Sequence, residues 1–216
     1  SRPNRFIANI EVDGKKEICH VKNTGRCKEL LVPNAAVFVQ EVNSEIRKTK
    51  YDLISVYKGN TLINIDSQAP NKIFFEWLCR SSIFSKEALI KPETTYCSSR
   101  FDFYVENGDR KAYIEVKGVT LEEDGVALFP DAPTERGLKH INELCDCLEE
   151  GYEAYIVFII QLKGVHSFSP NVRMHEAFAN ALSSAAEKGV KIIALDCIVT
   201  QDTIEADEFV NVKLRP

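Results

Sequence analysis

The sequence predicts a mixed α/β (α+β) protein in which a small all-β unit is followed by a mixed sheet flanked by helices. Up to about residue 67 the segments are short, alternate apolar with polar residues and are separated by turn residues. After that point helical patterns alternate with apolar, β-branched strands, which indicates crossover connections and a sheet covered on both faces. We therefore expect two domains, 1–67 and 68–216, that pack closely.

The first domain is expected to be a small β-barrel. Its candidate strands cover residues 5–12, 17–22, 35–43, 51–58 and 60–66. Turn signals such as Asp13-Gly14 separate them. Five strands in about 65 residues suit an OB-like β-barrel, a fold that often holds oligonucleotides. The alternative is a barrel with a purely structural role.

The second domain is expected to begin with a helix over residues 71–86, with Asn71 as its N-cap. The elements predicted after it are a hairpin at 101–117, a long loop from 118 to 137, a helix at 134–150 capped by Thr134, a buried strand at 153–161, a helix at 172–188 and a last strand at 190–200.

Composition excludes several classes of protein. The formal net charge of −5 argues against a protein that coats nucleic acid non-specifically, but it is compatible with a local basic groove. The longest apolar runs have the length of a buried strand, so we expect no membrane span and no secretory signal. Seven scattered cysteines form no C-x-x-C pair. We therefore expect neither a zinc site nor a disulfide framework, and a reducing, cytoplasmic location fits best.

The stretch RFDFYVENGDRKAYIEVKG predicts a β-hairpin, because Asn107-Gly108 is a strong turn signal. A four-residue loop there places Glu106 opposite Lys111, which is a favourable pair. The same register places Asp102 opposite Glu115. A two-residue loop would instead shift the register by two and would still leave both acids on the same face. Two like charges that face each other across a strand pair repel unless a cation lies between them.

Asp102, Glu115 and Lys117 form the candidate catalytic set. They share one face of the hairpin because side chains alternate along a strand. The other face is filled by Phe101, Phe103, Ile114 and Val116. Asp102 and Glu115 are the expected ligands of Mg²⁺ or Mn²⁺, since such a cation would remove their repulsion. Lys117 would orient a water or stabilise charge on a phosphate. The alternative is an ordinary half-solvated sheet face.

The order of helix, hairpin with D…E-x-K, helix and strand is that of the PD-(D/E)XK nuclease fold, whose acids bind the metal that activates water for phosphodiester hydrolysis. Five longer stretches together resemble the sugar fermentation stimulation protein A family. They are NTGR (23–26), SRFDF (99–103), EVKGVTL (115–121), FPDAPTERGLKH (129–140) and FSPN (168–171).

The resemblance implies an OB-like β-barrel joined to a PD-(D/E)XK restriction-endonuclease-like domain. It implies that Asp102, Glu115 and Lys117 are the core motif, with Glu76 on the preceding helix as a weaker fourth member. Phe101 stands where the motif name expects proline, a position that shapes the strand and does no chemistry. The family name records a regulatory effect on sugar metabolism, and DNA binding has been attributed to the family.

The NTGR turn is a candidate contact for nucleic acid. Its members are Asn23, Thr24, Gly25 and Arg26. Backbone amides at a glycine turn and an arginine side chain suit a phosphate or a base edge. The alternative is a tight barrel turn with a solvated arginine.

Further candidates for nucleic-acid contacts lie in the second domain. Arg100 is part of the SRFDF stretch. Arg136 lies in the first turn of a predicted helix, where an anion is favoured, and His140 lies four residues later on the same helical face. An ordinary helix terminus with a structural histidine is the alternative. Gln161 either reaches the active edge of the sheet or simply ends its strand.

Two functions of different class follow from these observations. The first is a Mg²⁺-dependent nuclease that acts on DNA or a related nucleic acid. The second is a non-catalytic DNA-binding regulator of sugar (maltose) metabolism genes. The intact acids and lysine favour the nuclease, whereas the acidic net charge and the family name favour the regulator. The sequence does not decide between a monomer and a homodimer.

Overall fold

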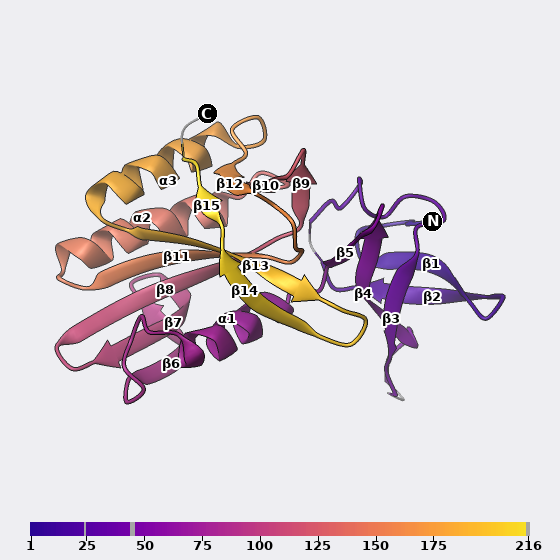
Figure 1. Cartoon of the computed structure of the whole chain (residues 1–216), viewed down its shortest axis with the longest axis horizontal. Coiled ribbons are helices and arrows are strands. Elements are labelled where there is room, and N and C mark those ends of the chain that lie inside the picture. Colours follow the sequence, from indigo (N-terminus) through magenta and orange to yellow (C-terminus); the bar gives the residue numbers. More distant parts are fainter. Residues whose placement is uncertain (24, 44–45, 215–216) are drawn as a thin grey trace.

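The computed structural model describes residues 1–23, 25–43 and 46–214. A five-stranded barrel lies at one side of the molecule, and a larger domain built on a six-stranded sheet lies at the other (Figure 1). The barrel and the mixed, helix-flanked sheet confirm the predicted α/β fold class.

The barrel strands are β1 (Ile7–Val12), β2 (Lys15–Val21), β3 (Val37–Glu41), β4 (Tyr51–Lys58) and β5 (Thr61–Asn64). β4 is central: it pairs parallel with β2 and antiparallel with β3 and β5, and β1 pairs with β2. Each of the five predicted strands is present. The alternating pattern predicted them because every second side chain, such as Cys19, Val21 and Leu53, fills the interior.

The elements of the second domain are, in chain order, α1 (Ala69–Arg80), β6 (Leu89–Tyr96), β7 (Ser99–Asn107), β8 (Arg110–Val119), β9 (Leu121–Glu123), β10 (Val126–Phe129), α2 (Glu135–Glu149), β11 (Glu153–Ile160), β12 (Ser167–Pro170), α3 (Glu176–Lys188), β13 (Lys191–Val199), β14 (Ile204–Phe209) and β15 (Asn211–Val212). In the described part of the chain no helix is long and apolar enough to cross a bilayer.

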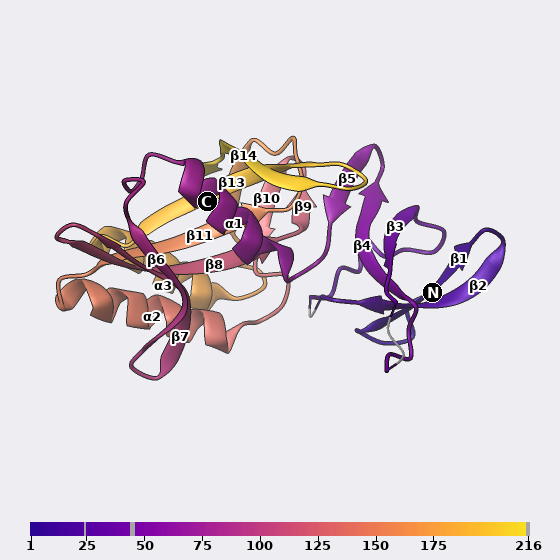
Figure 2. The ribbon, with the colours of Figure 1, turned by 90° about the horizontal axis from the view of Figure 1, so that it is seen from below.

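The large sheet has the strand order β14-β13-β11-β8-β7-β6. α1 covers one face, and α2 and α3 cover the other (Figure 2). Phe74 of α1 belongs to one buried cluster, and Ile141 of α2 and Phe178 of α3 belong to the other. β11 is buried along almost its whole length because it lies between these layers. This explains why its run of residues is apolar throughout.

α1 begins and ends earlier than the predicted range 71–86. Pro70 lies in its first turn, where a missing N–H costs nothing, and the Asp66 side chain accepts the N–H of Gln68 at 2.9 Å. These two features start the helix before Asn71. Asn71 is therefore a first-turn residue whose side chain is not used for capping, and not the N-cap that we predicted.

α3 ends at Gly189 as predicted, and the left-handed φ of +114° at that glycine stops the helix. Its start is later than in the predicted range 172–188. The backbone carbonyl of Asn171 accepts the N–H of His175 at 3.0 Å, which closes a separate turn before the helix begins at Glu176.

The segment 118–137 is not the long loop that we predicted. β9 and β10 form an antiparallel hairpin around Asp124-Gly125, both of which have positive φ angles of 50° and 78°. β10 continues into a small sheet with β12 and β15. The Asp-Gly pair is a hairpin signal that the glycine and proline content of the segment obscured. The strand predicted as the last is likewise followed by β14 and β15.

The β7–β8 hairpin has one of the two registers that the sequence left open, the one that pairs Glu106 with Lys111. Glu106 pairs with Lys111, and the described ladder continues to Phe103 opposite Ile114. The same register, extended by one residue, brings Asp102 of β7 to the level of Glu115 in β8. The turn at Asn107-Gly108 therefore sets which acids can meet.

Phe101 and Phe103 lie on opposite faces of the sheet, so the prediction that they share one face is wrong. The Phe103 ring lies 5.6 Å from Phe74 of α1, whereas the Phe101 ring lies 5.5 Å from Tyr113, which belongs to the cluster under α2. Regular alternation is interrupted between them because the Asp102 side chain, and not the β7 backbone, accepts a backbone N–H of β8.

The barrel and the large sheet are joined by direct hydrogen bonds. The backbone N–H of Asn64 in β5 donates to the carbonyl of Gln161, just beyond β11, at 3.0 Å. Lys58 of β4 donates to the Glu122 carboxylate of β9 at 2.6 Å. The end of the parallel strands β8 and β11 therefore faces the barrel.

Candidate active site

Glu115 lies on β8 with only 3% of its surface exposed. Its Oε1 accepts a hydrogen bond from Nδ1 of His140 at 2.6 Å and another from Nζ of Lys117. Its Oε2 is buried and has no hydrogen-bond partner among the described residues. An unpaired buried carboxylate oxygen is costly, and a cation is the kind of partner that would stabilise it.

Asp102 is held by one donor on each carboxylate oxygen. The Asn71 side chain of α1 donates to Oδ1 at 2.7 Å, and the backbone N–H of Val116 donates to Oδ2 at 2.8 Å. The carboxylate therefore has a fixed orientation at the end of the described β7–β8 ladder. Asn71 provides this contact because α1 begins two residues before it.

The pKa values of Asp102 and Glu115 are shifted in opposite directions. Burial, followed by the negative charge of Glu115, raises the pKa of Asp102 above its ordinary value. Burial also acts to raise the pKa of Glu115, but the hydrogen bond from His140 and the charge of Lys117 outweigh it, so that this pKa is lowered. Carboxyl groups whose pKa values are shifted by burial together with specific charged partners are typical of functional sites.

His140 lies behind Glu115 and not on an open surface. It is 3% exposed. Its Nδ1 donates a hydrogen bond to Glu115, and its Nε2 accepts a hydrogen bond from Nε of Arg136 at 3.4 Å. Arg136 is exposed in the first turn of α2, which Thr134 caps by accepting the N–H of Gly137 at 3.1 Å. We predicted Arg136 and His140 as contacts for nucleic acid, and the burial of His140 leaves only Arg136 open to such a ligand.

Two predicted residues are not brought to this site. Glu76 is exposed on α1 and has no interaction with Asp102 or Glu115 in the described part of the chain. Five residues on a helix correspond to a rotation of about 140°, so Glu76 points away from the side on which Asn71 reaches Asp102. Arg100 is also exposed, and its guanidinium lies 3.6 Å from the carboxylate of Glu93.

Hydrogen bonds from Asn23 and Arg26 hold the NTGR turn between the two domains. Asn23 is buried: its side chain donates to the carbonyl of Ile65 at 2.9 Å and accepts the N–H of Gly25 at 2.6 Å. The backbone N–H of Arg26 donates to Asp131 of the second domain at 2.8 Å. The Arg26 side chain is exposed, with no ion pair or hydrogen bond to any described residue. Thr24, the fourth member predicted, lies outside the described residues.

The sequence did not predict the roles of two residues in this region. Asn71 orients Asp102, although its only signal was a position before a helix. Asp131 holds the NTGR turn, and its only signal was its place inside the FPDAPTERGLKH stretch. Neither contact could be predicted, because each joins segments that are distant in the sequence.

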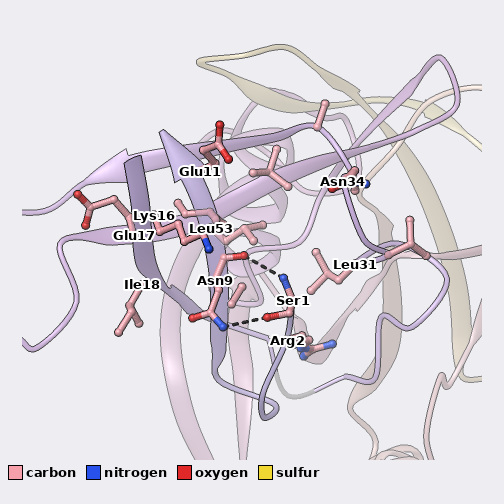
Figure 3. A pocket seen from close by; sticks show the side chains of 16 residues that line it. Ser1, Arg2, Asn9, Glu11, Lys16, Glu17, Ile18, Leu31, Asn34 and Leu53 are labelled. Atoms are coloured by element: carbon pink, nitrogen blue, oxygen red, sulfur yellow. Dashed lines mark hydrogen bonds between the residues drawn. The ribbon is translucent and has the colours of Figure 1, made fainter. Parts of the chain in front are cut away.

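A cavity lies on the barrel, far from the acids along the chain. It has a volume of about 850 Å³ between β1, β2 and residues 31–37 (Figure 3). Ser1 donates to the carbonyl of Asn9 at 3.1 Å at its edge, and the Asn9 side chain donates back to the Ser1 hydroxyl at 2.9 Å. Its charged lining residues are balanced in sign: Arg2, Lys16, Glu11 and Glu17. A phosphate backbone therefore finds as many acidic as basic side chains there.

A second acidic cluster lies at β13 and β14. Asp196, Asp207 and Glu208 bring carboxylate oxygens within 4.8 Å of one another. The ammonium of Lys163 lies among them, at 3.0, 2.7 and 2.9 Å. Because the Lys163 ammonium already donates to all three carboxylates, this cluster is a weaker candidate for a metal than the pair at Asp102 and Glu115.

Comparison with known proteins covers both domains. A family profile described as "SfsA N-terminal OB domain" matches residues 1–65, and one described as "Sugar fermentation stimulation protein RE domain" matches residues 68–203. A sugar fermentation stimulation protein homolog of Desulfitobacterium hafniense (strain Y51) is 64% identical over 214 residues, which covers 99% of this chain and 93% of the relative. A homolog from Clostridium beijerinckii is 56% identical over 213 residues, with coverage of 99% and 94%.

The fold is also similar to a solved structure, that of Pyrococcus furiosus SfsA in complex with Ca²⁺. The TM-score is 0.86 at 29% sequence identity, and the match covers 98% of this chain and 92% of that chain. Profiles, relatives and fold agree over nearly the whole length. The chain therefore belongs to the sugar fermentation stimulation protein family.

Proposed function

We propose that the protein is a divalent-metal-dependent nuclease whose active site is formed by Asp102, Glu115 and Lys117. The observation that supports this most directly is the pairing of a buried, unpartnered Glu115 Oε2 with a second carboxylate whose pKa is raised by the first. A purely structural acid on a sheet would be solvated or fully hydrogen-bonded. The lysine beside it adds a positive group suited to a phosphate.

The donor set suits a hard cation. Carboxylate oxygens are the ligands preferred by Mg²⁺ and Mn²⁺, which usually keep several waters besides one or two carboxylates. Asp102 and Glu115 would hold the ion. The related Pyrococcus furiosus protein has been solved in complex with Ca²⁺, another oxygen-seeking divalent cation, and this likeness supports a metal in the family.

Each residue of the site would then have a distinct role in catalysis. The bound ion would supply Lewis acidity and lower the pKa of a water that attacks the phosphodiester. Asn71 and the backbone N–H of Val116 keep Asp102 oriented. His140 keeps the Glu115 carboxylate in place, and Lys117 is the group that would stabilise charge on the phosphate.

Titration with Mn²⁺ by calorimetry tests the metal site. The wild type is expected to bind the ion, and Asp102→Asn to bind it at least roughly tenfold more weakly, since even indirect partners of a ligand cost that much. Asparagine has only one acceptor oxygen for the two groups that donate to Asp102, which lowers the stability of the fold. It also removes a buried charge, which raises it. These effects oppose each other, and we expect the melting temperature to change little.

The matched control is Asp109→Asn, which makes the same change of charge at an exposed turn of the same hairpin. It should bind Mn²⁺ like the wild type. Cleavage is then assayed with single-stranded, duplex and branched DNA and with RNA. Binding of nucleic acid without cleavage of any substrate, in either Mg²⁺ or Mn²⁺, would favour the alternative that the family name suggests, a non-catalytic DNA-binding regulator.

The NTGR turn is the proposed phosphate contact of the barrel. Arg26→Ala should weaken nucleic-acid binding evenly across sequences and reduce the slope of log affinity against log salt by about one, as expected for one lost phosphate contact. Fluorescence anisotropy at several salt concentrations measures this. Lys15→Ala, an equal loss of charge at the far turn of β1 and β2, is the control and should leave the slope unchanged.

An Arg26→Ala variant with unaltered affinity and slope would return Arg26 to the role of a solvated turn residue. A loss confined to one sequence would indicate that Arg26 reads a base edge instead.

A further inference from the structure

A small cavity of about 200 Å³ lies at the junction of the two domains, and we call it the junction cavity. Its walls include the NTGR turn of the barrel and the end of β8. Gly118, which lines it, directly follows Lys117 in the chain. The cavity therefore lies at the carboxyl end of a parallel strand pair, the place where open α/β sheets bind ligands, and next to the proposed active site.

Two glycines shape these walls. A Cβ at Gly118 would lie 2.7 Å from Oε1 of Gln161 and equally close to Pro70, and a Cβ at Gly25 would lie 2.4 Å from Oδ2 of Asp131. A Cβ at either position would force these neighbouring side chains to move. The glycines of the NTGR and EVKG stretches thus have a shared physical reason: each lets a neighbouring segment approach closely enough to close the junction cavity.

Gln161 presents a fixed acceptor there. It is 1% exposed, and its Nε2 donates to Oδ1 of Asn64 at 2.8 Å and to the carbonyl of Asp66 at 3.0 Å. These two acceptors determine which end of the amide is oxygen. Oε1 lies beside Gly118 and accepts no hydrogen bond from any described residue. A ligand that offers an N–H donor would satisfy it.

The lining selects against a phosphate. Among the described residues around the cavity there is no lysine, arginine or histidine, and Asp131 contributes a carboxylate. The rest of the lining combines the apolar side chains of Val119, Leu121, Leu128 and Phe129 with polar groups of Asn23, Ser67 and Thr120. The volume is smaller than the ~300–1,000 Å³ of pockets that enclose drug-sized ligands. A single flat heteroaromatic ring with an N–H group matches these properties.

We propose that the junction cavity binds one unpaired nucleobase of a strand whose phosphate lies at Lys117. This inference rests on the proposed function, because it takes the ligand of the neighbouring site to be a nucleic acid. A base inside an intact duplex cannot enter a cavity of this size. The cavity therefore selects single-stranded or locally unpaired substrates.

The test compares a fluorescent single-stranded DNA with the same strand made entirely of abasic units, in EDTA so that nothing is cut. We expect the wild type to bind the normal strand roughly tenfold more tightly than the abasic strand, the usual effect of one well-held base. Leu128→Trp fills the cavity from β10 and should bring this ratio close to one. Leu62→Trp, the same change in β5 at a different cavity, should keep the wild-type ratio.

Leu121→Trp, on the strand opposite Leu128, repeats the test if Leu128→Trp does not fold. A ratio near one in the wild type, or an unchanged ratio in both tryptophan variants, would overturn the inference. The assay needs neither metal nor cleavage, so its result is independent of the nuclease chemistry. Cleavage of duplex DNA without a preference for the normal strand over the abasic strand would leave the proposed function intact and remove only the cavity assignment. A preference for the normal strand without any cleavage would support the cavity assignment and remove the nuclease function.

Discussion

Glu115→Gln is expected to abolish metal-dependent cleavage and to weaken Mn²⁺ binding more than tenfold. Glutamine keeps the shape of the side chain but removes the charge that would hold an ion. It also leaves Lys117 without its carboxylate partner and offers one acceptor oxygen where the carboxylate offers two. Cleavage rates and calorimetric titration with Mn²⁺ measure both effects. The pKa of Asp102 should fall, because the charge of Glu115 is one of the causes that raise it.

Glu76→Gln is the matched control. It makes the same chemical change on an exposed position of α1, and it removes the fourth acid that the family resemblance suggests. Cleavage and metal affinity should equal those of the wild type. If Glu76→Gln lost activity and Glu115→Gln kept it, the active site would have to be sought on the outer side of α1.

Lys117→Ala is expected to slow cleavage on the order of 10²-fold or more, since this is the usual effect of removing one positioned electrostatic group. Binding of Mn²⁺ should be unchanged or slightly tighter, because the lysine is no ligand and its charge opposes a cation. Binding of nucleic acid should persist. This separation of binding from rate distinguishes a role in the chemical step from a role in metal binding.

Lys111→Ala, on the same strand and exposed, is the control and should cleave at the wild-type rate. Cleavage that persists at the wild-type level in both Lys117→Ala and Glu115→Gln would point to a contaminating nuclease. Cleavage lost only in Lys117→Ala, with Mn²⁺ binding lost as well, would contradict the division of roles between the lysine and the acids.

The barrel and the order of elements could be predicted because the signals are local. Alternation of apolar residues predicts β1 to β5, and Asn107-Gly108 predicts the β7–β8 turn. Asp124-Gly125 carries the same kind of signal, yet short strands of three and four residues around it offer little pattern. The starts of α1 and α3 were less accurate than that of α2, because contacts such as the one from Asp66 to Gln68 lie outside the periodic segment.

The acids themselves could be predicted, but their surroundings could not. Asn71 and Asp102 are separated by 31 positions, and Arg26 and Asp131 by 105. No local pattern links residues at such distances. The side on which Phe101 packs depended on a hydrogen bond from the Asp102 side chain to β8, which breaks the alternation that the prediction assumed.

The two oxygens of Glu115 are used unequally, and this has a consequence for affinity. Oε1 is engaged by both His140 and Lys117, and only Oε2 is open. One open oxygen and one neighbouring carboxylate give an ion few protein ligands, so most of its coordination must come from water and from the phosphate of a bound strand. Metal and nucleic acid would then bind synergistically, and by thermodynamic linkage each would raise the affinity of the other by the same factor. The protein alone would hold the ion weakly and would become fully loaded only on its substrate.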